Sequence, residues 1–433
     1  RVRNCLTDLD KFRNRIEKVI SMNHPFRQSN AAYEELRGMV GTAELDFVHI
    51  VAPPRSCSTA LERALSNSPD IDMQINDPWS IYDSDRERQT YDYILKRITA
   101  RRRPPSIRPF RVLVKSIADY IAPGEQWDRM TNLCAYTIFL VRQPLLSTES
   151  MMRIMAKEVP PNDGYAQRHG YTDWETLLSH VYHARDYTDL TELYEEFFPT
   201  EQPIHAAPEM QLPVLEHTPT YILRNLGYLS RDSYAQTKKY NSWTLLLRHL
   251  KKCPDSLHLC DDLLKANFAC RILGWAALGQ HFKRTDPRRR FVVDATMYRA
   301  LPQLVLGRLL ASMGLASSPA VISWGGSGKK FETDYGGTVP YYHKISTSTE
   351  LHPPTEDPVS LERFPGFVRK ELTCAGGAIQ TYHKLLAESL KYFSRDQALT
   401  ILDWRHEGIS LAEFDPIFND HYRAILKIPE QSH

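Results

Sequence analysis

The sequence lacks several features that would place a chain of 433 residues in a specialised class. No stretch approaches the ~20 consecutive apolar residues that cross a bilayer, so we expect no membrane span. Lys and Arg number 54 against 52 Asp and Glu, which gives a net charge of +2. Because that balance supplies no strong field, we expect no nucleic-acid partner and no anionic membrane surface.

Cysteine is too sparse and too irregularly spaced to form a framework. The seven cysteines include no C-x-x-C pair, so we expect neither a disulfide scaffold nor a structural zinc site. There is no H-E-x-x-H motif, and His180 and His183 have no clear third ligand, so no metal is expected. A reducing compartment fits this pattern, and we expect a cytoplasmic protein, although the chain begins at Arg1 rather than Met.

Short apolar runs rich in β-branched residues alternate with helical patterns in the first third of the sequence and again near residue 291. These runs cover residues 47–51, 71–75, 112–114, 136–141 and 291–293. Strands that alternate with helices form a parallel sheet that is covered on both faces. The sequence therefore predicts an α/β fold, a three-layer parallel sheet flanked by helices.

Between residues 160 and 288 the strand pattern stops and amphipathic helical patterns replace it, over 173–196, 241–252 and 256–280. We expect one domain over 1–433, with a helical preamble over 1–45, a helical insertion over 160–288 and a C-terminal helical extension over 350–433. The Tyr, Trp and His residues of the insertion suit an acceptor-binding cap, although at helical spacing such residues are more often core.

The most informative stretch runs from strand to loop to helix between Val48 and Leu61, with Pro-Pro-Arg-Ser-Cys-Ser-Thr-Ala in the loop. A helix N-terminus presents unpaired N–H groups and a partial positive charge, which together suit an anion. Arg55 adds a fixed charge, and the neighbouring Ser and Thr add hydroxyl donors. The alternative is an ordinary strand-to-helix turn whose serines cap the helix.

A second polar segment follows the strand predicted at 136–141. Arg142 would lie at the carboxyl end of that strand, where ligands bind in open parallel sheets. Pro144 suits the first turn of the next helix, which would place Ser150 two turns from the strand. The alternative is an arginine in a surface ion pair and an unrelated helical serine.

Together the two segments resemble sulfotransferases that use 3′-phosphoadenosine 5′-phosphosulfate (PAPS). Pro-Arg-Ser-x-Ser-Thr-x-Leu resembles the family's 5′-phosphosulfate loop, and an Arg followed eight positions later by Ser resembles its 3′-phosphate site. The resemblance implies a P-loop-like sulfotransferase fold and transfer of a sulfuryl group from PAPS to a hydroxyl or amine of a small or medium-sized organic acceptor, with release of PAP and without metal. It also implies that the nucleotide is held by Arg55, Ser56, Cys57, Ser58, Thr59, Ala60, Arg142 and Ser150.

The resemblance extends more loosely to a third region and has two departures. It covers roughly residues 45–155 and 288–330, and the Gly-Lys-rich segment 324–330 resembles the basic loop that covers the nucleotide in the family. There Trp324 is predicted to stack on adenine and Lys329 to contact phosphate, but an exposed turn explains the segment almost as well. Many members of the family have Gly at the position of Cys57 and Asp at that of Gln143.

A hydroxyl acceptor must lose a proton as the sulfur is attacked, which calls for a general base. Asp77 lies at the end of the strand predicted over 71–75. It resembles the Glu of a Glu-Pro pair that some sulfotransferases carry there, although the Asp side chain is one methylene shorter than that of Glu. Lys115 is the alternative, and it could contact the sulfuryl oxygens instead. Asn-Asp-Pro is also ordinary turn chemistry. Arg55 is expected to lie near the charge that develops during transfer.

Two other functions compete with a sulfotransferase. A kinase or NTPase of the P-loop type needs G-x-x-x-x-G-K-[ST] after a strand. The segment 325–330 lacks that spacing, and the loop at 53–61 has neither Gly nor Lys. A non-catalytic nucleotide-binding protein would keep both phosphate sites and transfer nothing. The order of the two segments, each after a strand, favours the sulfotransferase.

Overall fold

The computed structural model describes residues 30–80, 86–101, 108–121, 124–156, 163–183, 228–264, 274–324, 348–354, 359–364, 366–373 and 377–393, with residues 212, 215, 218, 223 and 266 besides. Within these ranges, no helix is both long enough and apolar enough to cross a membrane.

A five-stranded parallel sheet forms the centre of the protein. Its strands are β1 (Leu45–Ala52), β2 (Met73–Asn76), β3 (Phe110–Ile117), β4 (Cys134–Val141) and β5 (Arg290–Asp294). They lie in the order β2-β3-β1-β4-β5, and every neighbouring pair is parallel. The five strands fall on the five predicted runs, which confirms the expected α/β class.

The strands are almost continuously apolar because both faces of the sheet are covered. Val48, Ile50 and Val51 of β1 are fully buried, as are Val112 and Leu113 of β3. A one-sided sheet would instead alternate polar and apolar residues, so these runs are typical of parallel sheets between two helical layers.

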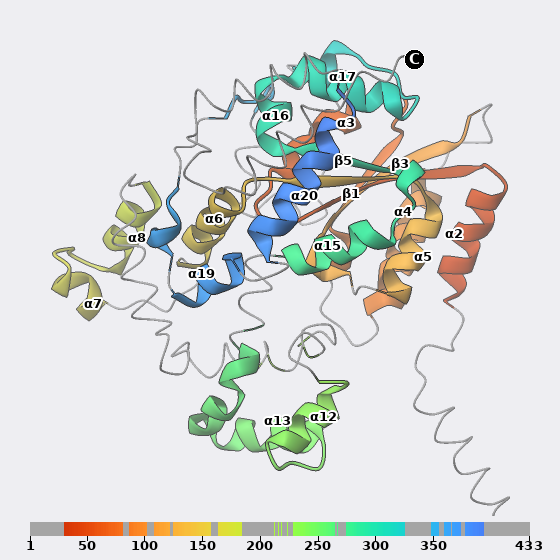
Figure 1. Ribbon diagram of the computed structural model, residues 1–433. Helices are drawn as coiled ribbons and strands as arrows, with labels where there is room; N and C mark the ends of the chain where they lie inside the picture. The colour runs from red at the N-terminus through yellow and green to blue at the C-terminus, as the bar shows by residue number, and fades with distance from the viewer. Residues whose placement is uncertain are drawn as a thin grey trace, which may run out of the picture.

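Helices cover both faces of the sheet, as Figure 1 shows. On one side lie α3 (Ser58–Ser66), α16 (Ala295–Ala300) and α17 (Pro302–Ser312). On the other side lie α2 (Ala31–Gly41), α4 (Arg86–Arg101), α5 (Glu125–Leu133) and α15 (Trp275–Arg284). Two further helices, α6 (Pro144–Ala156) and α20 (Ala378–Leu390), pack against each other, and α20 also contacts β5. The arrangement has the three layers that the sequence predicts.

Between α6 and α15 the described residues contain helices and no strand. They form α7 (Asp163–Arg168), α8 (Trp174–His183), α12 (Arg231–Thr237), α13 (Trp243–Lys252) and the 3-10 helix η4 (Pro254–Cys260). The continuous helix predicted over 256–280 is wrong, because α15 begins only after Gly274, whose φ of +53° breaks the helical path. Towards the C-terminus, α19 (Gly366–Thr373) precedes α20.

Two buried histidines flank a tryptophan between β1, α5 and α15. His281 stacks on Trp127 with ring centroids 4.0 Å apart, and His49 lies 5.6 Å from the same ring. The His49 Nε2 atom lies 3.0 Å from the Ser116 hydroxyl, and the His281 Nε2 atom lies 2.9 Å from the Ala118 carbonyl oxygen. Burial lowers the pKa of His49 to about 3 and that of His281 to about 4, so both rings are neutral at physiological pH.

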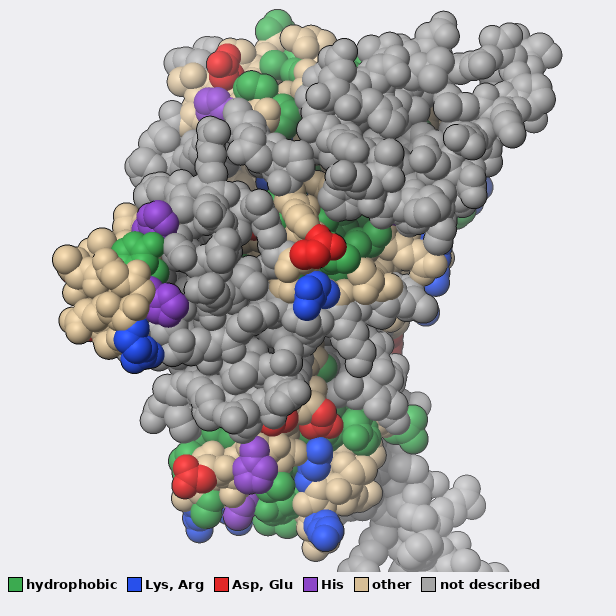
Figure 2. Space-filling view, turned by 60° about the vertical axis from the view of Figure 1, so that its left-hand side comes forward, with side chains coloured by type: hydrophobic (Ala, Val, Ile, Leu, Met, Phe, Trp, Pro, Cys, Tyr) green, Lys and Arg blue, Asp and Glu red, His purple; other side chains and the backbone are tan. Residues whose placement is uncertain are grey.

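Charged side chains of the described residues do not gather by sign on the face seen in Figure 2. Lys and Arg are interspersed with Asp and Glu there, as the net charge of +2 leads one to expect. Opposite charges also pair across elements, for example Arg284 of α15 with Asp128 of α5.

Candidate functional site

The direction in which the sheet is built reverses at β1, so the carboxyl end of β1 is the topological switch point of the sheet. After β1 the chain builds β2 and β3 on one side of it, and then β4 and β5 on the other. Connections that leave in opposite directions open a crevice at the carboxyl ends of such strands, where ligands bind in open α/β sheets. The loop Pro53–Cys57, which we call the phosphate loop, starts at this point.

The phosphate loop has a strained backbone at two residues that are not glycine. Arg55 has a φ of +59° and Cys57 a φ of +61°, in the left-handed region that side chains other than Gly disfavour. Each such residue costs about 1–3 kcal/mol and persists only where its surroundings hold it, commonly at functional sites. The strain therefore marks this loop as a candidate site.

The loop ends at the N-terminus of α3, and no side chain caps this end of the helix. Cys57 is the N-cap residue and its side chain makes no capping hydrogen bond. Ser58 and Thr59 form the first turn, with Ser58 buried and Thr59 half-buried. A helix end of this kind has N–H groups and positive partial charge to offer an anion.

A buried hydroxyl in the loop has no partner in the described part of the chain. Ser56 is fully buried, and its Oγ atom makes no hydrogen bond to any described residue. Buried polar atoms are nearly always hydrogen-bonded, so an unsatisfied one in a candidate site fits a ligand that supplies the partner.

The two segments predicted to bind opposite ends of a nucleotide contact each other. Arg142, at the end of β4, donates from Nη1 to the carbonyl oxygen of Arg55 at 2.8 Å. Arg55 donates from Nε to the hydroxyl of Ser150 at 3.2 Å, with Ser150 on the second turn of α6. The helix begins at Pro144, as predicted. These residues are 87 and 95 positions apart in sequence, so only the fold brings them together.

The two candidate bases form one buried ion pair. The Nζ atom of Lys115 on β3 binds Oδ2 of Asp77, which follows β2, and both side chains are less than a tenth exposed. Asp77 has a φ of +44°, another strained position. Its other carboxylate oxygen, Oδ1, is buried without a hydrogen bond to any described residue. The pair therefore holds the carboxylate in a fixed orientation, and no described residue binds its Oδ1 atom.

A second buried carboxylate, which the sequence analysis missed, contacts the residue before Asp77. Glu62 of α3 is fully buried, and one of its oxygens accepts a hydrogen bond from the side-chain amide of Asn76, the residue before Asp77. Nothing in the helical pattern around Glu62 separates it from a solvent-facing glutamate. The contact ties the helix that starts at the phosphate loop to the strand that carries Asp77.

The helix α16, which follows β5, also contacts the phosphate loop. The hydroxyl of Tyr298 on α16 donates to the carbonyl oxygen of Cys57 at 2.8 Å, and Arg299 lies with Nη1 3.8 Å from the Cys57 sulfur. Asp294 fixes the start of α16 by accepting from the amides of Thr296 and Met297. The sequence analysis missed Tyr298 and Arg299, since neither lies in a recognisable motif.

Trp324 and Lys329, the nucleotide contacts predicted after α17, receive less support from the structure than the phosphate loop does. Trp324 is 1% exposed, its Nε1 donates to the Ser348 carbonyl oxygen at 2.7 Å, and the Arg63 guanidinium lies over its ring at 4.8 Å. Stacking on adenine would require this ring to be uncovered. Lys329 lies outside the described residues.

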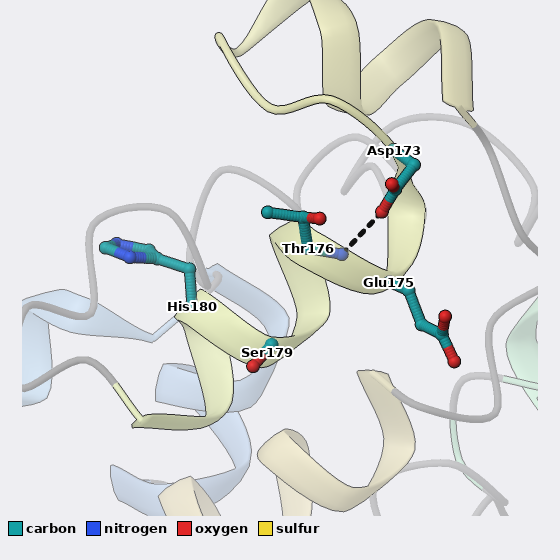
Figure 3. Close-up of a pocket in the computed structure, with 5 residues that line it drawn as sticks. All are labelled: Asp173, Glu175, Thr176, Ser179 and His180. Atoms are coloured by element: carbon teal, nitrogen blue, oxygen red, sulfur yellow. Dashed lines mark hydrogen bonds between the residues drawn. The ribbon is translucent and has the colours of Figure 1, made fainter.

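A separate surface pocket lies on α8 and is drawn in Figure 3. Asp173, Glu175, Thr176, Ser179 and His180 line it. The Thr176 amide donates to Asp173 at 2.7 Å, and this hydrogen bond lowers the pKa of the carboxyl group. His180 lies towards the other end of the helix from Asp173. In the described ranges, no group of three or more His, Cys, Asp or Glu side chains could hold a metal ion.

Comparison with known proteins gives a distant structural match. No protein-family model and no curated protein matches the sequence. Among solved structures, the chain is similar to the "Sulfotransferase Domain from the Curacin Biosynthetic Pathway" at 11% identity and a TM-score of 0.29, over 83% of this chain and 97% of that one. Because similarity at this level assigns no activity, the function has to be inferred from the residues of the site.

Proposed function

We propose that this protein is a sulfotransferase that moves the sulfuryl group of PAPS to a hydroxyl or amine of a small or medium-sized organic acceptor and releases PAP. The observation that carries the proposal is the contact of Arg55 with both Arg142 and Ser150 at the carboxyl end of β1. Those are the residues that resemble the two phosphate sites of the family.

The groups around the phosphate loop suit the anionic ends of PAPS. Two guanidinium groups, Arg55 and Arg142, form charge-assisted hydrogen bonds with phosphate oxygens better than neutral donors do. The uncapped N-terminus of α3 and the unpartnered Ser56 hydroxyl add neutral donors. A P-loop kinase or NTPase would instead use a lysine and a magnesium ligand in the loop, and the loop contains neither the lysine nor the glycines of that motif.

The Asp77–Lys115 pair suits the proton transfer that sulfuryl transfer requires. The acceptor oxygen attacks sulfur, the bond from sulfur to the bridging phosphate oxygen breaks, and PAP leaves with that electron pair. The acceptor proton passes to Asp77 Oδ1, the oxygen that Lys115 does not bind. Arg55 and the loop amides offset the charge that develops on the leaving oxygen.

Calorimetry with PAP in EDTA tests the nucleotide site. We expect binding in the micromolar range or tighter, without divalent metal, and much weaker binding of AMP, which lacks the 3′-phosphate. The same titration with ATP and Mg²⁺ examines the kinase alternative. No binding of PAP up to millimolar concentration would contradict the proposal.

A transfer assay separates an enzyme from a binding protein. Labelled PAPS is incubated with a mixed library of phenols, alcohols and amines, and the label is followed into products. We expect transfer to at least one acceptor class. Tight PAP binding with no transfer to any nucleophile would indicate a non-catalytic nucleotide-binding protein.

A further inference from the structure

The helical segment between β4 and β5 returns to the sheet directly against the phosphate loop. Gly274, the N-cap residue of α15, is buried there with a φ of +53°. A Cβ atom at this position would lie 2.8 Å from Cδ of Pro54 and 3.4 Å from Cα of Pro53. Glycine is therefore required twice, by its left-handed backbone and by its close approach to the loop.

The glycine cannot easily move away from the loop, because α15 is held along its length. His281 bonds to the Ala118 carbonyl oxygen at 2.9 Å. Trp275 packs edge-on against Tyr382 of α20 with ring centroids 5.9 Å apart, and the Tyr382 hydroxyl donates to the buried Asp294. A side chain added at residue 274 would consequently push on Pro54.

Pro54 can transmit such a push to the binding residues. Its ring is rigid and it directly precedes Arg55, which is held at a φ of +59°. The Arg55 carbonyl accepts from Arg142, and its side chain donates to Ser150. A shift of Pro54 by a few tenths of an ångström therefore disturbs both contacts that join the two proposed phosphate sites.

We propose that Gly274 is a positioning residue for PAP and PAPS binding. Its contact with Pro54 sets the strained conformation in which the phosphate loop presents Arg55. This inference rests on the proposed function, since PAP is the ligand whose affinity reports the loop conformation.

The test compares Gly274→Ala with Gly314→Ala. Gly314 ends α17 with a φ of +64°, and a Cβ atom there meets nothing within 4 Å. Both variants thus carry the same left-handed strain, but only the first contacts the phosphate loop. We expect Gly274→Ala to weaken PAP binding at least tenfold by calorimetry and Gly314→Ala by less than twofold, with both folded by circular dichroism.

A second substitution distinguishes positioning from general damage. Pro54→Ala removes Cδ, the atom that the new methyl group would meet, so the double variant should recover most of the affinity lost in Gly274→Ala, relative to Pro54→Ala alone. If Gly274→Ala does not fold, recovery of folding and PAP binding in the double variant carries the same test.

Several results would overturn the inference. They are equal losses of affinity in the two glycine variants, an unchanged affinity in Gly274→Ala, and no recovery in the double variant. Each of these leaves the proposed function intact if the wild-type protein binds PAP. Failure of the wild-type protein to bind PAP would overturn both proposals.

Discussion

The phosphate loop and the pocket on α8 are polar surfaces built in different ways. The loop is held by elements from distant parts of the sequence: by α6, by the start of α15 and by Tyr298 of α16. The α8 pocket is lined by residues within eight positions of one another, mostly on one exposed helix. The loop contains strained residues and a buried hydroxyl without a described partner, whereas the main polar contact in the pocket is the local cap of Asp173.

This difference separates a site that is preorganised from a surface that is merely polar. Side chains fixed before a ligand arrives lose little conformational entropy on binding, and charges placed in advance need little reorganisation during reaction. Exposed side chains on a single helix have neither property. The loop is therefore the better candidate for chemistry.

Removing the proposed base should have the largest effect. In Asp77→Asn the side chain keeps its shape but loses the ability to take a proton, so we expect transfer to fall by about two decades or more. PAP affinity, measured by calorimetry, should stay within about threefold of wild type because the phosphate-binding groups are untouched.

The matched control removes a carboxylate from the other region. Glu175→Gln on α8 should leave both transfer and PAP affinity unchanged, since it lies in the exposed pocket. Wild-type transfer by a folded Asp77→Asn variant would rule Asp77 out, and Lys115 would then be the residue to examine.

Substituting the two arginines should have different effects on PAP affinity and on the rate of transfer. Arg142→Ala should weaken PAP binding roughly 10- to 100-fold and reduce the preference for PAP over AMP, because it removes a cation from the proposed 3′-phosphate site. Arg55→Ala should mainly lower the rate of transfer, because its charge lies near the leaving oxygen. Equal effects of both substitutions on rate and affinity would contradict these roles. His180→Ala on α8 serves as the control that should change neither.

A smaller effect concerns stability and the two buried histidines that flank Trp127. Their folded pKa values, about 3 for His49 and about 4 for His281, lie below the ordinary value of 6.5. The unfolded chain therefore binds more protons below pH 6.5, and stability contributed by the neutral rings is lost as pH falls from about 6.5 towards 4. Each ring steepens that loss by up to about 1.4 kcal/mol per pH unit.

Urea unfolding between pH 7 and 4.5 measures this effect. His49→Gln can keep a hydrogen bond to Ser116 without titrating, so its stability should fall less steeply with acid than that of the wild type. An exposed histidine, His258 of η4, provides the control His258→Gln, which should retain the wild-type slope. Identical slopes for wild type and His49→Gln would show that His49 is not the group responsible.

Much of the fold could be predicted because its signals are local. Each strand is an apolar run of a few residues, and Pro144 begins α6 where its fixed φ and missing N–H are tolerated. The error at 256–280 has an equally physical origin: the sequence Gly-Trp within an amphipathic pattern does not reveal that Gly274 takes a left-handed conformation against Pro54.

The candidate site divides in the same way. The sequence by itself determined that Arg55, Arg142, Ser150 and Asp77 follow strands, because strand ends and motifs are written in consecutive residues. Only the tertiary structure decided that Lys115 binds Asp77, that Glu62 holds Asn76, and that Tyr298 and Gly274 support the loop. Those contacts join residues far apart in sequence, and their partners are selected by the order of the strands and the packing of the helices, which no local pattern encodes.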